Sequence, residues 1–158
     1  MAPAWIIVVA GLIAGLAASL VMNLYQSVTS PLFGQGAGGE ESATIKAADS
    51  AHELAAGDPV AEPHRERAGN LVHYATGAVL GIGYALLVAG WPPASAGFGM
   101  AFGLVLAVLL DDIIVPAFGW GPWPGQAGPA THAYSLSSHL VFGVALEAVR
   151  RLVLAFLA

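Results

Sequence analysis

Four stretches of this chain are long and apolar enough to cross a lipid bilayer. They cover residues 4–26, 71–90, 95–118 and 131–151, and the first two contain no charged side chain. About 20 apolar residues in a helix span a hydrocarbon core of about 30 Å, and a helix satisfies its own backbone hydrogen bonds there. The sequence therefore predicts an all-α integral membrane protein, a four-helix bundle that forms a single transmembrane domain over residues 1–158. The first stretch lacks a basic flank and exceeds a signal-peptide core in length, so we expect it to be retained.

Composition narrows the function. Only 9% of the residues are charged and there is no cysteine. The absence of cysteine excludes disulfides, thiolate nucleophiles and thiolate metal sites. Five lysines and arginines provide no basic surface for nucleic acid. No Gly-rich phosphate motif and no G-x-S-x-G turn is present. We therefore expect a protein that is neither an enzyme nor a nucleic-acid-binding protein.

A long acidic loop, residues 28–70, joins the first two predicted spans. It contains seven acidic and three basic side chains, namely Glu40, Glu41, Asp49, Glu53, Asp58, Glu62 and Glu66 with Lys46, Arg65 and Arg67. A short helix is predicted from Glu40 to Ala56, with acids at its positive end and a stop at Gly57. We interpret the loop as a solvated cap, with a lid over the polar side chains described next as the alternative.

Glycine spacing predicts how the helices pack. Pairs of glycines four residues apart occur at Gly11 and Gly15, Gly77 and Gly81, and Gly99 and Gly103. Membrane helices associate through close packing, and small residues at this spacing let two backbones approach. The pattern predicts a tight bundle in the lipid bilayer, with a homo-oligomer or a larger membrane complex as the expected assembly.

Polar side chains of the predicted spans gather near one face of the membrane. The cluster comprises Asn23, Gln26, His73, Asp111, Asp112 and His139. His73 lies four residues from Gly77 and His139 four from Gly143, so both imidazoles are expected on packed faces. Regular α-helical geometry directs Asp111 into the bundle and Asp112 toward the headgroups or a partner.

Three interpretations of this cluster remain open. His73, Asp111 and His139 could hydrogen-bond across helices and fix their register. They could form a site that handles protons or ions, because burial and neighbouring charge can bring such groups near neutral titration. They could also bind a transition metal, or the two histidines a haem iron, although no metal-binding spacing such as H-E-x-x-H supports this. We expect no cofactor, with haem or a transition metal as the alternative.

A second charged group lies near the other face. Glu147 precedes Arg150 by three residues and Arg151 by four, which places the three side chains on one helix face. An ion pair that neutralises Glu147 is the simplest interpretation. Contact of the arginines with lipid phosphate or a partner subunit is the alternative.

The chain resembles the YagU-type family of small bacterial inner-membrane proteins. The matching pieces are GLIAG at 11–15, the segment from His73 to Tyr84, Pro116, and the segment from His139 through Glu147 to Arg151. The resemblance implies an inner-membrane location with both termini in the cytoplasm, and it supplies no reaction. The family pattern has histidine at the position of Asp111 and an acid at that of Gln26, an exchange that favours a hydrogen-bonded or titrating network over a metal site.

These observations predict a membrane protein without enzymatic activity, either a structural or accessory protein or a small subunit of a membrane complex. A small transporter or proton-responsive membrane protein that uses His73, Asp111 and His139 is the alternative. A metal or haem carrier is the third possibility.

Overall fold

The protein is helical throughout the part of the chain that the structure describes. The computed structural model describes residues 2–34 and 41–157, and these ranges contain no strand. The helices are α1 (Ala4–Thr29), η1 (Ser30–Phe33), α2 (Ala43–Ala56), η2 (Glu62–His64), α3 (Arg65–Gly90), η3 (Pro92–Ser95), α4 (Met100–Leu106), η4 (Ala107–Ile114), α5 (Val115–Ala117) and α6 (Pro129–Leu157). The expectation of an all-α protein is confirmed.

Three helical segments are long and apolar enough to cross a membrane. They are Ala4–Phe33, Glu62–Gly90 and Met100–Ala117. Helix α6 has 29 residues but is not among them, and it carries two histidines in its first half and three charged side chains in its second. The finding is consistent with a membrane protein.

The segment between the first two long helices is more ordered than a loop. Helix α1 reaches Thr29 and α3 begins at Arg65, so both exceed their predicted lengths. Helix α2 begins after Ser42, whose hydroxyl accepts a hydrogen bond from the Ile45 amide at 3.4 Å. The prediction that acids open this helix is wrong, because Glu41 precedes the cap and Glu40 lies outside the described residues. The predicted stop is present, at Gly57 with φ +91°.

Close contacts between glycines determine how the long helices cross. A Cβ added at Gly15 would lie 2.1 Å from the Gly77 carbonyl oxygen, where α1 crosses α3. A Cβ at Gly99 would lie 2.1 Å from the Gly143 carbonyl oxygen, where the start of α4 meets α6. Both distances are far below van der Waals contact, so only glycine permits these approaches. Each crossing places a histidine four residues before the glycine of its later helix, His73 in α3 and His139 in α6.

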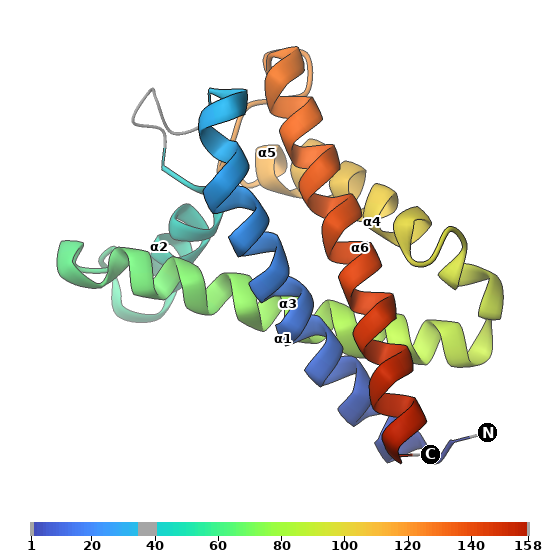
Figure 1. Ribbon diagram of the computed structural model, residues 1–158. Helices are drawn as coiled ribbons and strands as arrows, with labels where there is room; N and C mark the ends of the chain where they lie inside the picture. The colour runs from blue at the N-terminus through green and yellow to red at the C-terminus, as the bar shows by residue number, and fades with distance from the viewer. Residues whose placement is uncertain (1, 35–40, 158) are drawn as a thin grey trace.

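The four long segments form two crossed layers. Figure 1 shows α1 and α6 side by side and antiparallel, with α3 and the α4–η4 segment passing across them. Both termini lie together at one end of the molecule, and α2 lies beside the first part of α3. From the glycine crossings the helices spread apart toward α2 and α5.

The core combines small, aromatic and aliphatic side chains. Ala14, Ala18, Tyr84, Phe142 and Leu146 pack together between the crossings. Large apolar side chains such as Leu20, Val79 and Leu104 point outward instead and are about half exposed or more. In water such a surface would be unfavourable, whereas lipid tails are as apolar as these side chains. The distribution therefore fits helices whose outer faces contact lipid.

Candidate functional site: a polar cavity between the helices

A cavity of about 760 Å³ lies where the helices diverge. Helices α1, α3, η4 and α6 contribute its wall, and residues of α2 and the segment before α6 also line it. The structure places all six residues of the predicted polar cluster on this wall, namely Asn23, Gln26, His73, Asp111, Asp112 and His139. Four separate helical segments thus bring amide, imidazole and carboxylate groups to one space.

Both aspartates lie on an irregular helical segment. Residues Ala107–Ile114 form a π-helix, in which hydrogen bonds run from i to i+5. The wider turn changes the angle between successive side chains from the α-helical value. Asp112 therefore lines the same cavity as Asp111, and its carboxylate lies 3.7 Å from Nδ1 of His132. The expectation that Asp112 faces away from the bundle is corrected accordingly.

Asp111 and His139 form the closest contact within the cluster. Oδ2 of Asp111 accepts a hydrogen bond from the Ser135 hydroxyl and lies 3.4 Å from Nδ1 of His139. The same Nδ1 lies 3.0 Å from the Ser135 carbonyl oxygen. Because a carbonyl only accepts, Nδ1 donates in this contact. The arrangement is a carboxylate–imidazole pair beside an accessible cavity.

His73 belongs to another part of the wall. Its Nε2 lies 3.3 Å from the Ser19 carbonyl oxygen. The rings of His73 and Tyr74 pack in a T-shaped arrangement with their centroids 5.5 Å apart. The amide of Asn23 donates to the Tyr74 hydroxyl at 3.4 Å. The structure thus brings Asp111 and His139 into contact, while His73 is held by α1 across the same cavity.

The cluster does not have the geometry of a metal site. Within residues 2–34 and 41–157, no three side chains of the His, Cys, Asp and Glu types are grouped closely enough to hold a metal ion. His73, Asp111 and His139 share a cavity without converging on one point. The geometry therefore gives no support to a metal ion held by three such side chains.

Helix α2 is fastened beside the mouth of the cavity. The Trp120 indole donates to the Ser50 hydroxyl at 2.9 Å, and Ile45 packs against Gly69 of α3. Arg65, at the start of α3, donates to Asp49 and Glu41. These contacts join α2 to two of the segments that surround the cavity.

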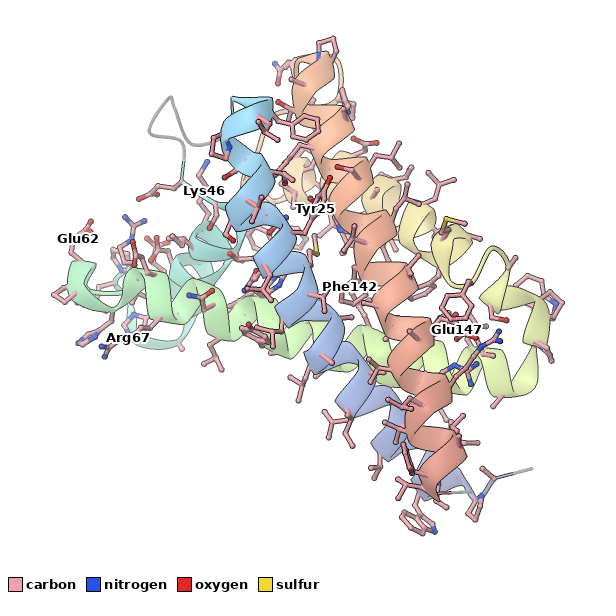
Figure 2. All side chains as sticks on the ribbon, viewed as in Figure 1. Tyr25, Lys46, Glu62, Arg67, Phe142 and Glu147 are labelled. Carbon is pink, nitrogen blue, oxygen red and sulfur yellow. The ribbon has the colours of Figure 1, made fainter. Side chains whose placement is uncertain are left out.

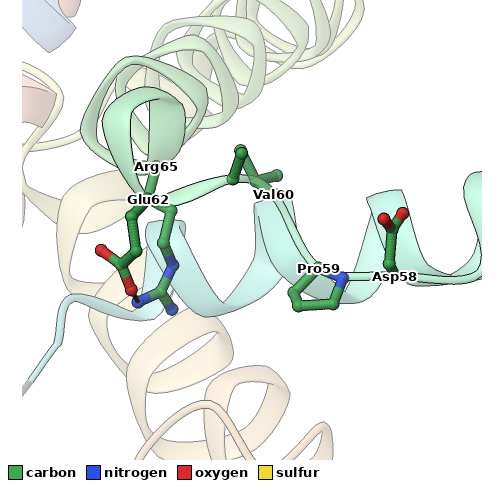
Figure 3. Close-up of a pocket in the computed structure, with 6 residues that line it drawn as sticks. Asp58, Pro59, Val60, Glu62 and Arg65 are labelled. Atoms are coloured by element: carbon green, nitrogen blue, oxygen red, sulfur yellow. Dashed lines mark hydrogen bonds and ion pairs between the residues drawn. The ribbon is translucent and has the colours of Figure 1, made fainter.

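Arg65 is the centre of this attachment. Its Nε donates to Asp49 at 3.1 Å, and its Nη1 donates to Glu62 at 3.2 Å, a contact drawn beside a hollow of about 480 Å³ in Figure 3. The Val60 amide adds a bond to Asp49 at 3.2 Å. The hydrogen bonds from Arg65 hold the pKa of the Asp49 carboxyl below its usual range.

The second charged group has a different environment. Glu147 is fully buried, and its carboxylate accepts bonds from Arg150 at 2.7 and 2.9 Å and from Arg151 at 2.6 Å. The Tyr84 hydroxyl of α3 donates a fourth bond at 2.9 Å. Arg151 also lies over the ring of Phe98, 4.9 Å from its centroid. Figure 2 shows Glu147 well away from Tyr25, which marks the other end of the bundle.

Two parts of these sites were not anticipated. Tyr84 lies seven residues after Gly77, and that spacing places both on one helix face, so the signal for its inward position was present. The attachment of α2 by Arg65 had no local signal, because Asp49 and Arg65 are sixteen residues apart.

Comparison with protein-family models, curated proteins and solved structures finds no match to this chain.

Proposed function

We propose that this protein is a small proton-linked transporter of a bacterial plasma membrane, with four helices that cross the bilayer and both termini in the cytoplasm. Helix α6 is the fourth span, because it packs along the membrane-compatible helix α1 and has ample length. The cavity then opens toward the outer side. The family placement and the orientation rest on the sequence segments that resemble YagU-type proteins.

The contact between Asp111 and His139 on the wall of the cavity carries this proposal. Ionisable side chains within membrane segments are costly and commonly mark proton or ion pathways. The side chain of Asp111 is 34% exposed and lines the cavity. The His139 imidazole, whose Nδ1 lies 3.4 Å from Asp111, offers a second proton-binding group through its other ring nitrogen. Both groups can therefore exchange protons with the cavity.

A structural or accessory role is the second candidate, and the glycine crossings favour it. Tight crossings at Gly15 and Gly99 give a rigid scaffold of the kind that a subunit of a membrane complex requires. A protein of this kind would use the cavity contacts only to hold its helices together. Neither candidate includes a covalent reaction at the site.

Proton flux into liposomes distinguishes these two roles. The protein is reconstituted into vesicles that contain a pH-sensitive dye, and a pH gradient is imposed with valinomycin and potassium to compensate charge. We expect acidification faster than in empty vesicles, and at least about tenfold slower flux for Asp111→Asn and His139→Gln, because each removes a proton-binding group. The thermal unfolding temperature of both variants should stay close to that of the unchanged protein.

A matched control is His64→Gln, since His64 is exposed on η2 and does not line the cavity. It should leave the flux unchanged. Flux equal to that of empty vesicles, or equal flux for all three variants and the unchanged protein, would refute the transport proposal. Unfolding of both cavity variants without any flux to lose would instead support the structural role.

A further inference from the structure

The cavity wall is acidic without any strong base. Carboxylates of Asp111 and Asp112 line it, together with that of Glu41, which already accepts hydrogen bonds from Arg65. None of the described residues on its wall is lysine or arginine. Three histidines also line it and carry positive charge only when protonated. A ligand in this space therefore meets negative charge and hydrogen-bond acceptors, which excludes anions as favourable occupants.

The size of the cavity indicates a molecule instead of a bare ion. Ligand pockets in proteins commonly have volumes of about 300–1,000 Å³, and this one, at about 760 Å³, lies within that range. No cluster of three metal-binding side chains is grouped among the described residues. An inorganic cation would lack the convergent oxygen ligands that it requires.

A buried hydroxyl on the wall has no bonding partner. Ser19 is fully buried and lines the cavity beside His73, and its Oγ makes no hydrogen bond within the described residues. This hydroxyl packs against Gly77 where α1 crosses α3 and is sealed from the cavity, so it is not available to a ligand. Trp120 and Tyr134 also line the cavity, and aromatic rings attract ammonium groups.

We infer that the cavity binds a small organic cation, a compound with one or more ammonium groups on a short carbon chain. The inference rests on the proposed transport function and names its substrate class. An ammonium group binds beside Asp111 and Asp112, and the chain extends along the mixed polar and apolar wall toward His73. The remaining carboxylate, Glu41, lies on the segment that leads into α2.

Protons and the cation compete for the same carboxylates. Asp111 faces His139 and Ser135 from α6, His73 from α3, and Asp112 from its own helix, while Glu41, His132 and Tyr134 line the same space. Protonation of Asp111 removes the charge that holds the ammonium group, and protonation of the histidines adds repulsion. Binding of the cation should therefore release protons.

Calorimetric titration of the purified protein in a neutral detergent tests the inference. The probe is 1,4-diaminobutane, and the matched neutral probe is 1,4-butanediol. We expect heat of binding for the diamine only, with an affinity that falls at least about tenfold in Asp111→Asn because a charge partner is lost. The affinity should also fall as the pH is lowered from 7.5 to 5.5. Titration in two buffers of different ionisation enthalpy should show proton release.

Two further variants make the result specific. Asp112→Asn removes the second aspartate carboxylate of the cavity wall, so it should also weaken diamine binding while the protein stays folded. Glu53→Gln removes an exposed carboxylate on α2 that does not line the cavity, and it should leave the affinity unchanged.

Several outcomes would overturn the inference. They are the absence of diamine binding, binding of the diol with the same affinity as the diamine, and an affinity of Asp111→Asn equal to that of the unchanged protein. Another is the disappearance of the binding heat when potassium is present at the same concentration as the diamine. The liposome assay separates this failure from that of the proposed function. Proton flux without diamine binding would refute the substrate class alone, whereas diamine binding without flux would refute transport and leave the cation site in place.

Discussion

His139 and Glu147 lie two turns apart on the same face of α6, yet their environments are opposite. The Glu147 carboxylate is fully buried and accepts four hydrogen bonds between 2.6 and 2.9 Å. The carboxylate beside His139 belongs to Asp111, has a side chain that is 34% exposed, and lies 3.4 Å from the imidazole. One pair is closed and fully bonded, and the other is open and incompletely bonded.

This difference separates the structural charge of Glu147 from the charge of Asp111, which is available to other partners. A buried carboxylate with its acceptor positions filled by two arginines and a tyrosine has little capacity to bind anything else. An open carboxylate in a cavity can exchange its partner at small cost. The glycine crossings lie between the two groups, so the same close packing that buries Glu147 also forms the floor of the cavity.

The largest expected effect is the loss of the Glu147 charge. Glu147→Gln leaves Arg150 and Arg151 without their counter-ion, and breaking a buried ion pair on one side is unfavourable by about 3–5 kcal/mol. We expect a large fall in the thermal unfolding temperature, measured by circular dichroism in detergent. Asp111→Asn should lower the free energy of unfolding by about 1 kcal/mol or less, because the Asp111 charge is partly solvated.

Glu53→Gln serves as the control for this measurement, since it changes the same chemical group at an exposed position of α2. Equal stability of the Glu147 and Asp111 variants would remove the distinction between the two charge clusters.

The next largest effect is expected at the glycine crossings. Gly15→Ala and Gly99→Ala each place a methyl group 2.1 Å from a carbonyl oxygen of the neighbouring helix, so the helices must separate. Overpacking of this kind costs about 1–3 kcal/mol. Gly99 has φ +85°, which adds strain for alanine. Thermal unfolding measures both losses.

Gly83→Ala is the matched control in α3, because an added Cβ there meets nothing within 4 Å. It should leave stability unchanged or raise it by about 1 kcal/mol, since alanine favours helix over glycine. Comparable losses at Gly83 and Gly15 would show that the close crossing does not determine the result.

Much of this fold follows from patterns that are local in sequence. The apolar stretches predicted the long helices, and helical spacing placed His73 beside Gly77 and His139 beside Gly143 on packed faces. The depth of Asn23 and Asp111 along their helices could also be predicted, because it follows from the rise per residue. These features need no knowledge of the other helices beyond their number.

Other features depend on contacts that no local pattern encodes. The π-helix at Ala107–Ile114 turns Asp112 into the cavity, and its wider turn contradicts the regular spacing that the prediction assumed. The extension of α3 back to Arg65 is stabilised by Asp49 and Glu41 on distant parts of the chain. Predicting them requires the positions of neighbouring elements first.

The smallest expected effect concerns the attachment of α2. The pKa of Asp49 is lowered by the hydrogen bonds from Arg65, so the folded protein releases this proton more readily than the unfolded chain. The ion pair therefore contributes its full stabilisation above the unfolded pKa, about 4. This contribution is lost as the pH falls below that value through the lowered pKa of the folded state. Emission of Trp120, which bonds to Ser50 of α2, should report the loss.

Asp49→Asn should diminish the change in Trp120 emission below pH 4, because the ion pair is then absent at every pH. Comparison with Trp120→Phe isolates this signal from the other tryptophans. Asp111→Asn should retain the change, since Asp111 belongs to the open cavity pair and does not hold α2. If Asp111→Asn abolishes the change and Asp49→Asn preserves it, the cavity carboxylate controls the position of α2. The open cluster would then have a structural role as well, and the contrast with Glu147 would narrow to a difference in degree.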